Sequence, residues 1–123
     1  MAYQIGAACY ILWGVLHIAA AVQGWRLSAG VHDGVIKSRL QQNAWHLGIF
    51  ALAAIFVAAT LNWHNSAAGY WINLVMISVV DIGFVVLVAL PGHIERRAAI
   101  AGPALWILGA VFSTYGFLTY PTT

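Results

Sequence analysis

Three ionisable residues lie inside long apolar stretches of this chain and could do chemistry there: His17, His46 and Asp81. Placing such a side chain in hydrocarbon costs at least about 2.5 kcal/mol, and retained examples usually face a bundle interior or a wet cavity. Asp81 has no lysine or arginine within a helical turn. Its partner must therefore come from another helix, or the carboxyl group must be protonated.

The distance of these residues from the nearest basic connection places them at similar depths. His17 lies nine residues before Arg26, which corresponds to about 13 Å along a helix. By the same count, His46 lies about 10 Å inside that boundary. Asp81 falls about one turn deeper, and Trp106 returns to the depth of His17. We therefore expect one polar layer to which all the helices contribute.

Polar and aromatic side chains recur at helical spacing beside these residues. Trp13 and His17 share one face of their helix, as do Gln42 and His46, because residues four apart project from the same side. Faces that mix polar groups with apolar walls are typical of ligand pockets. The residues predicted to line such a pocket are Trp13, His17, Gln42, His46, Asn73, Asp81 and Trp106.

Several kinds of chemistry suit this predicted pocket. His17 and Asp81 could act as acid and base toward a lipophilic small molecule such as a quinone, a sterol or an isoprenoid. Alternatively, His17 and His46 could be the axial ligands of a haem b or could bind a metal ion. Together with Asp81 they have the composition of an iron site with two histidines and one carboxylate. Intramembrane histidine and aspartate also serve in proton relays.

A purely structural role is the main alternative. Buried polar side chains can hydrogen-bond between helices and determine packing alone, at about 0.6 kcal/mol per bond. Gly109, Ser113 and Gly116 form a stripe of small residues that allows another helix to approach closely. On this hypothesis the chain is an accessory or scaffolding subunit of a larger membrane complex, or it forms a homo-oligomer.

The composition of the chain predicts the kind of structure that must position these residues. The chain has 123 residues, of which 63% are hydrophobic and 7% charged, whereas about 25% of the residues in soluble domains are charged. The mean hydropathy is +0.87, so a lipid bilayer is the expected solvent. The five basic residues are too few and too confined to form a nucleic-acid surface. The single cysteine, Cys9, excludes an intrachain disulfide.

Four apolar runs are long enough to cross a bilayer, which takes about 20 residues. They predict an all-α membrane protein, a single domain of residues 1–123 built as an antiparallel bundle of four transmembrane helices. Residues 26–42 combine charged and apolar positions at helical spacing, which predicts a short interfacial helical segment before the second span. The predicted spans are about 3–25, 43–61, 69–90 and 98–118.

The basic residues predict the orientation in the membrane. All five fall in or beside the first and third connections between spans, and basic connections face the cytoplasm. We therefore expect both termini outside, which for a bacterial inner membrane means the periplasm, and the polar pocket in the cytoplasmic half. The basic residues are Arg26, Lys37, Arg39, Arg96 and Arg97.

Overall fold

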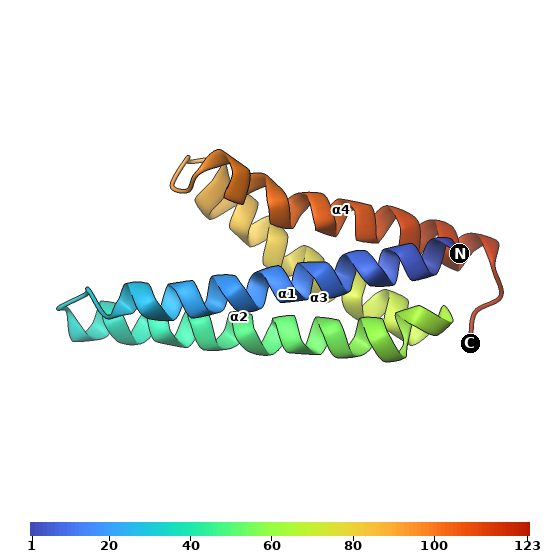
Figure 1. The fold of residues 1–123 in the computed structure, drawn as a ribbon, viewed down its shortest axis with the longest axis horizontal. Coiled ribbons are helices and arrows are strands. Elements are labelled where there is room, and N and C mark those ends of the chain that lie inside the picture. Colours follow the sequence, from blue (N-terminus) through green and yellow to red (C-terminus); the bar gives the residue numbers. More distant parts are fainter.

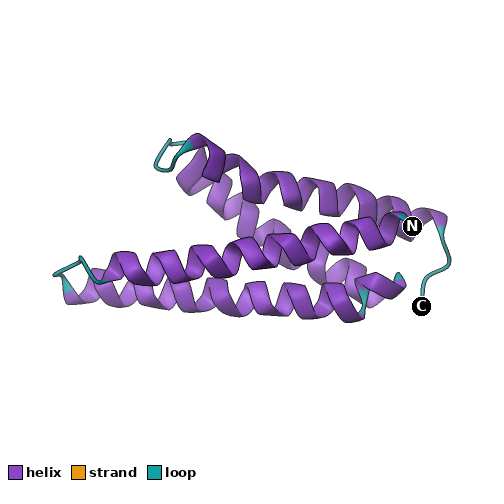
Figure 2. Cartoon of the chain, in the orientation of Figure 1, coloured by secondary structure: helices purple, strands orange, loops and turns teal.

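The computed structural model describes residues 1–123 and contains helices and short loops, without any strand (Figures 1 and 2). Consecutive long helices run in opposite directions, as Figure 1 shows. The elements are α1 (Ala2–Ser28), α2 (Gly34–Thr60), the 3₁₀ turn η1 (Asn62–His64), α3 (Ala67–Phe84), the π-helical turn η2 (Val85–Ala89) and α4 (Arg96–Thr119).

The helical segments meet the length and composition that a membrane requires. Many large apolar side chains stay exposed on the outside of the bundle, Leu90 and Leu118 among them, as suits a surface in contact with lipid. The chain is an integral membrane protein of the all-α class, so the prediction of four apolar helices packed as a bundle is confirmed. The segments long and apolar enough to span a membrane are Ala2–Ser28, Gly34–His64, Ala67–Ala89 and Arg96–Thr119.

The first helix forms the centre of the bundle. α1 packs along both α2 and α4, whereas α3 makes fewer contacts with either neighbour. In Figure 1, α1 lies between α2 and α4, and α3 crosses behind it. Glycines allow this close packing. A Cβ atom on Gly6 would lie 2.7 Å from the backbone nitrogen of Ser113 in α4, and one on Gly14 would lie 2.9 Å from the carbonyl oxygen of Ala51 in α2.

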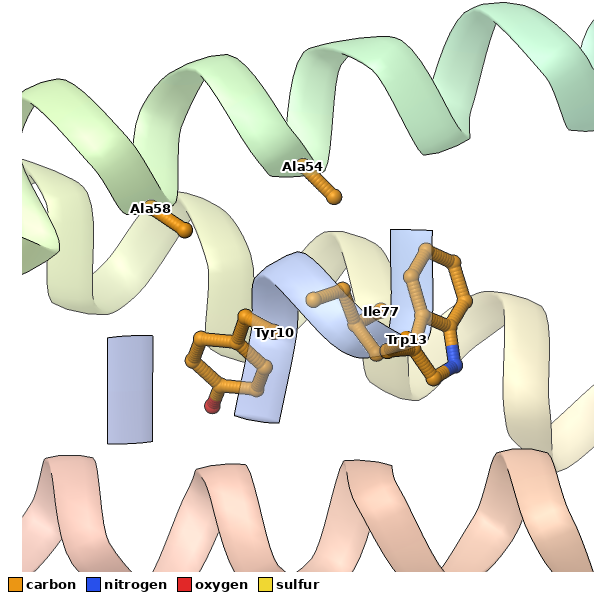
Figure 3. Close-up of a cluster of buried hydrophobic side chains, with 5 residues drawn as sticks. All are labelled: Tyr10, Trp13, Ala54, Ala58 and Ile77. Carbon is orange, nitrogen blue, oxygen red and sulfur yellow. The ribbon is translucent and has the colours of Figure 1, made fainter. Parts of the chain in front are cut away.

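A small apolar core fills the centre between the helices (Figure 3). Tyr10 and Trp13 of α1 pack with Ala54 and Ala58 of α2 and with Ile77 of α3, and all of them are fully buried. The alanines matter because small side chains on α2 leave room for the aromatic rings of α1. This core anchors Trp13, which also contributes to the polar cluster described below.

The segment predicted to lie at the interface before the second span is not a separate element. The carboxylate of Asp33 caps the helix and accepts a hydrogen bond from the backbone N–H of Ile36 at 2.9 Å. From Gly34, α2 then continues without a break to Thr60. No proline interrupts this stretch, so nothing ends the helix at the boundary between interface and span. The expected interfacial helix is therefore the first turns of α2.

The two ends of the bundle differ. The basic residues lie in the helix turns beside the connections 29–33 and 90–95. Both connections lie at one end, opposite both termini (Figure 2), and the α1–α2 pair diverges from α4 toward that end (Figure 1). At the other end, the side-chain amide of Asn65 donates hydrogen bonds to the carbonyl oxygens of Tyr120 and Pro121 at 3.3 and 3.0 Å. The bundle is thus closed near its termini and spread at the basic end.

Candidate functional site

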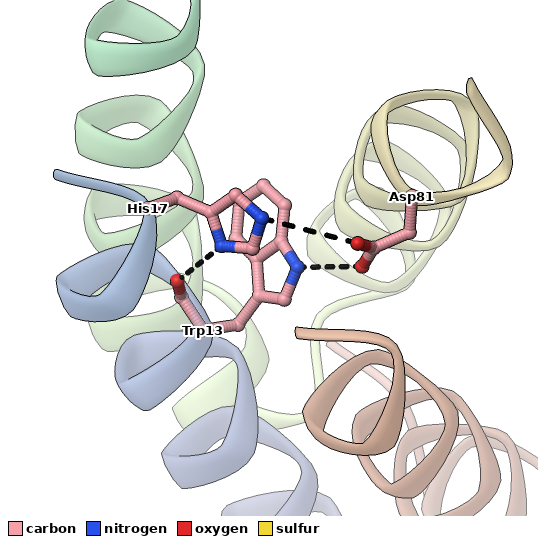
Figure 4. Close-up of polar contacts among 3 residues, drawn as sticks. All are labelled: Trp13, His17 and Asp81. Carbon is pink, nitrogen blue, oxygen red and sulfur yellow. Dashed lines mark hydrogen bonds and ion pairs between the residues drawn. The ribbon is translucent and has the colours of Figure 1, made fainter. Parts of the chain in front are cut away.

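The buried carboxyl group of Asp81 is held by an indole from another helix. The Nε1–H of Trp13 in α1 donates a hydrogen bond to Oδ2 of Asp81 in α3, with 2.6 Å between nitrogen and oxygen (Figure 4). Both side chains are fully buried. The carboxyl group thus takes its hydrogen bond across helices, as its position in the sequence requires, and the donor is neutral.

His17 completes the site one turn further along α1. Its ring stacks on the indole of Trp13, with ring centroids 3.9 Å apart and planes inclined by 24°. Its Nδ1 lies 2.8 Å from the backbone carbonyl oxygen of Trp13, and its Nε2 faces Oδ1 of Asp81 at 3.9 Å. Since a carbonyl oxygen only accepts hydrogen bonds, Nδ1 must be the donor. We call Trp13, His17 and Asp81 the polar cluster.

One oxygen of the polar cluster has no hydrogen-bond partner. Oδ1 of Asp81 is buried and unpartnered, which is costly for a carboxyl oxygen in an apolar interior. Gly102 of α4 lies against it. A Cβ atom at Gly102 would be 3.5 Å from Oδ1 of Asp81 and 3.1 Å from Cε1 of His17. The missing side chain therefore allows α4 to pack closely against both groups.

A cavity of about 770 Å³ lies beside the polar cluster. His17 and Gly102 form part of its wall, and α1, α2, α3, η2 and α4 all contribute residues to the lining. Twelve of the 18 lining residues are hydrophobic, so polar groups are few. The polar lining residues are His17, Gln23, Asn43 and His46.

The third helical segment changes its hydrogen-bonding pattern where it borders the cavity. Val85–Ala89 form a π-helical turn, after which the N–H of Leu90 bonds to the carbonyl oxygen of Val85 at 2.9 Å. Leu87 and Val88 of this turn line the cavity. Such turns occur where helices end, and Pro91 follows directly after Leu90. The cavity wall thus includes the last turn of the third helical segment.

The structure places the predicted site residues in different surroundings. The polar cluster joins some of them, as described above. His46 lines the cavity, but its side chain is exposed and no hydrogen bond connects it to His17. Gln42 lies outside the cavity lining and accepts a hydrogen bond from Arg39 at 3.0 Å. Residues four apart on one helix face therefore do not all reach the same site.

Asn73 and Trp106 belong to other hydrogen-bonded groups. The amide of Asn73 donates to Oδ1 of Asn62 at 2.8 Å and to the carbonyl oxygen of Ala54 at 3.2 Å. The indole N–H of Trp106 donates to Oγ of Ser78 at 2.8 Å. Neither residue lines the cavity. Spacing along the chain estimates depth, but the rotation of each helix about its own axis decides which neighbour a side chain meets.

Metal binding was one of the expectations for this region. No group of three or more histidine, cysteine, aspartate or glutamate side chains lies where it could hold a metal ion. The iron site expected from His17, His46 and Asp81 is therefore not formed. The two ring nitrogens of His17 are directed at Trp13 and Asp81 (Figure 4). A haem or metal held by His17 and His46 alone stays a prediction.

Of the predicted pocket residues, only His17 and His46 line the cavity, and the wall residues that reasoning from the sequence missed include Gln23, Asn43 and Gly102. Asn43 lies three residues before His46 and so on the same helix face, which was a usable signal. Gly102 gave no such signal, because its role depends on how closely α4 approaches His17 and Asp81.

The fold and the buried pair of His17 and Asp81 define a small integral membrane protein with four helices able to span the bilayer. No protein-family model, curated protein or solved structure matches the chain. The function must therefore be inferred from the cavity and the polar cluster.

Proposed function

We propose that the protein binds a lipophilic small molecule in the cavity of its bundle. The observation that carries this proposal is the position of His17 in the wall of a mostly apolar cavity, with the buried carboxyl group of Asp81 behind it at 3.9 Å. Apolar walls with a few well-placed polar groups are the usual composition of small-molecule sites. A polar cluster that served helix packing alone would need no cavity beside it.

The size and the lining of the cavity favour a compact apolar molecule with one polar end. Its volume of about 770 Å³ falls within the range of about 300–1,000 Å³ for small-molecule sites. Phe50 and Phe84 provide flat apolar wall, which suits a ring system or an isoprenoid chain. His17 would contact the polar end, and the pair of His17 and Asp81 would act as acid and base if the molecule is a substrate.

The proposed orientation places the cavity in the cytoplasmic half of the membrane. The basic residues lie at the spread end of the bundle, in or beside the loops that Figure 2 shows opposite the termini. Basic connections face the cytoplasm, so both termini lie outside. Ile94, in the connection between η2 and α4, and Ala98, in the first turn of α4, belong to the cavity wall. A ligand would therefore enter from the cytoplasmic leaflet or from the adjacent cytoplasm.

Photolabelling of the protein in lipid nanodiscs tests the proposal. The probe is a long-chain primary alcohol that carries a diazirine in its chain. We expect saturable labelling of the cavity wall at residues such as Leu47, Phe84 and Leu87. The variant Ala101→Phe adds a ring to that wall and should weaken binding by about tenfold or more, equivalent to about 1.4 kcal/mol.

The variant Ala59→Phe is the matched control, because Ala59 is exposed and lies outside the cavity lining. It should be labelled like the wild type. Labelling that does not saturate and is equal in all of these proteins would contradict the proposal and favour an accessory or scaffolding subunit. An absorption spectrum and a metal analysis test whether the cavity holds a haem or a metal ion instead. A Soret band or stoichiometric metal that is lost in His17→Ala would identify that occupant.

A further inference from the structure

A groove lies on the outside of the bundle between α1 and α2, which run side by side to the basic end (Figure 1). Small residues keep these two helices close. A Cβ atom at Gly48 would lie 3.7 Å from that of Ala21, and one at Gly24 would lie 3.6 Å from that of Ala44. The groove has a volume of about 270 Å³, and none of its lining residues lines the cavity. We call it the α1–α2 groove.

The lining of the α1–α2 groove suits contact with lipid. Seven of its eight residues are hydrophobic, and the tryptophans among them are exposed, Trp25 at 50% and Trp45 at 64%. Tryptophan is enriched where the hydrocarbon of a bilayer meets the headgroups. A volume of about 270 Å³ is small for a helix, which is about 10–12 Å across with its side chains. A single acyl chain can lie along such a groove.

Two basic residues lie at the end of the groove nearest the connection between α1 and α2. Arg26 is one turn beyond Val22 of the lining, and Lys37 is seven residues before Ala44 and so on the same face of α2. Because Gly24 packs against Ala44, Arg26 lies level with about residue 42, which is about 8 Å from Lys37 along the helix axis. Both long side chains can therefore reach one headgroup.

Arg26 and Lys37 have no charged partner within the protein. The structure holds a single ion pair, which involves neither of them, and among the lysine and arginine side chains only that of Arg39 donates a hydrogen bond. The carboxylate of Asp33, four residues before Lys37, accepts the backbone N–H of Ile36 instead. Both cations are thus free to pair with an external anion, and basic side chains beside a membrane span attract anionic phospholipids.

We infer that the α1–α2 groove binds an anionic phospholipid, with one acyl chain along the groove and the phosphate group between Arg26 and Lys37. The apolar lining accounts for the chain, and the two unpaired cations account for the charge of the headgroup. The lipid belongs to the leaflet at the basic end, which is the cytoplasmic leaflet in the orientation proposed above. This site lies outside the cavity and does not depend on the ligand proposed there.

Fluorescence quenching by brominated lipid tests the inference, because bromine atoms on an acyl chain quench tryptophan on contact. The protein is reconstituted in phosphatidylcholine vesicles that contain an increasing fraction of phosphatidylglycerol with dibrominated chains. A selective site saturates at a low fraction, whereas unselected lipid around the protein quenches in proportion to its fraction. We expect a saturating phase that Trp45→Phe reduces. Its apparent affinity should be about tenfold higher than that of dibrominated phosphatidylcholine.

Two variants address the two parts of the site. Gly48→Leu fills the groove, and Ala59→Leu is its control, because Ala59 is exposed on the same helix outside the groove. Lys37→Gln removes one cation, and Arg39→Gln is its control, because residues two apart lie on different faces of a helix. The saturating phase should be lost in Gly48→Leu, weaken about fivefold in Lys37→Gln and persist in both controls.

Three results would overturn the inference. Equal quenching curves for the two brominated lipids would show that the headgroup charge is not recognised. A saturating phase that persists unchanged in Lys37→Gln would place the lipid elsewhere, and this variant changes only a partly exposed side chain, so the test stands even if Gly48→Leu does not fold. Quenching by either lipid that Trp45→Phe leaves unchanged would indicate that a second copy of the chain covers the groove.

Discussion

At the scale of single residues, Trp13 organises the site. Its indole N–H donates to Asp81, its carbonyl oxygen accepts from His17, and its ring stacks on the imidazole. The same side chain is part of the apolar core. A tryptophan can serve both purposes because its large ring system is apolar and carries one strong donor. The position of the buried carboxyl group therefore depends on core packing as well as on a hydrogen bond.

Trp13→Phe should destabilise the bundle, because it leaves Oδ2 of Asp81 without its donor. The expected loss is about 1–3 kcal/mol for the unpaired carboxyl group, in addition to the lost ring volume. Unfolding of the detergent-solubilised protein, followed by circular dichroism during titration with sodium dodecyl sulfate, measures the change.

A double-mutant cycle separates the hydrogen bond from the lost volume. Asp81→Leu in the Trp13→Phe background removes both partners, so no polar group is left unpaired across this contact. We expect the double variant to lose less stability than the sum of the single variants, with a coupling of about 0.5–3 kcal/mol. Strictly additive losses would show that the hydrogen bond contributes nothing.

At the scale of elements, the contact between α1 and α4 relies on residues without bulk. Cβ atoms at Gly6 and Gly109 would collide with Ser113 and Tyr10 respectively. Association of helices in lipid depends on such close approach, because the hydrophobic effect does not favour contact between apolar helices in a bilayer. Gly102 belongs to the same helix α4 and faces the polar cluster. The spacing of α1 and α4 thus sets both the packing of the bundle and the room beside His17.

Gly6→Ala should therefore separate α1 from α4 and lower the free energy of unfolding by about 1–3 kcal/mol, the usual cost of overpacking. Gly83→Ala is the control, because a Cβ atom at Gly83 would meet nothing within 4 Å. There the substitution should be neutral or slightly stabilising, since alanine favours helix over glycine. Thermal denaturation in detergent compares the two variants, and equal losses would contradict the role assigned to the close approach.

At the scale of the whole molecule, charge and shape are arranged along the same axis. The bundle is closed by hydrogen bonds from Asn65 near the termini and spreads toward the opposite end, where the basic residues lie (Figures 1 and 2). The cavity lies in the spread half, as its lining by Ile94 and Ala98 shows. Orientation in the membrane therefore decides from which side the cavity is reached.

Cysteine accessibility tests the proposed orientation. Cys9 is the only cysteine, so Cys9→Ala provides a background in which His64→Cys and Glu95→Cys each mark one end of the bundle. Both positions are exposed. A membrane-impermeant maleimide added to intact cells should label His64→Cys and leave Glu95→Cys unlabelled until the membrane is permeabilised. The reverse pattern would place the basic end and the cavity outside.

The sequence by itself determined the class of the protein and the approximate limits of its first, third and fourth helical segments, whereas α2 begins at Gly34 and not near residue 43. Apolar runs predicted at about 3–25 and 69–90 correspond to Ala2–Ser28 and Ala67–Ala89, because backbone hydrogen bonds in a helix are local and a bilayer admits few other structures. The need of Asp81 for a partner on another helix also follows from the sequence, since no basic residue lies near it on its own helix.

Only the tertiary structure decided which partners the polar residues have. The face that each helix turns inward depends on contacts such as those of Gly6 and Gly14 with neighbouring helices, and these contacts involve residues far apart in the chain. Trp13 and His17 therefore meet Asp81, while Asn73 and Trp106 bond elsewhere. The spacing of residues along one helix determines their depth and the helix face on which they lie. The rotation and separation of the helices depend on packing between them, and so does the cavity beside His17.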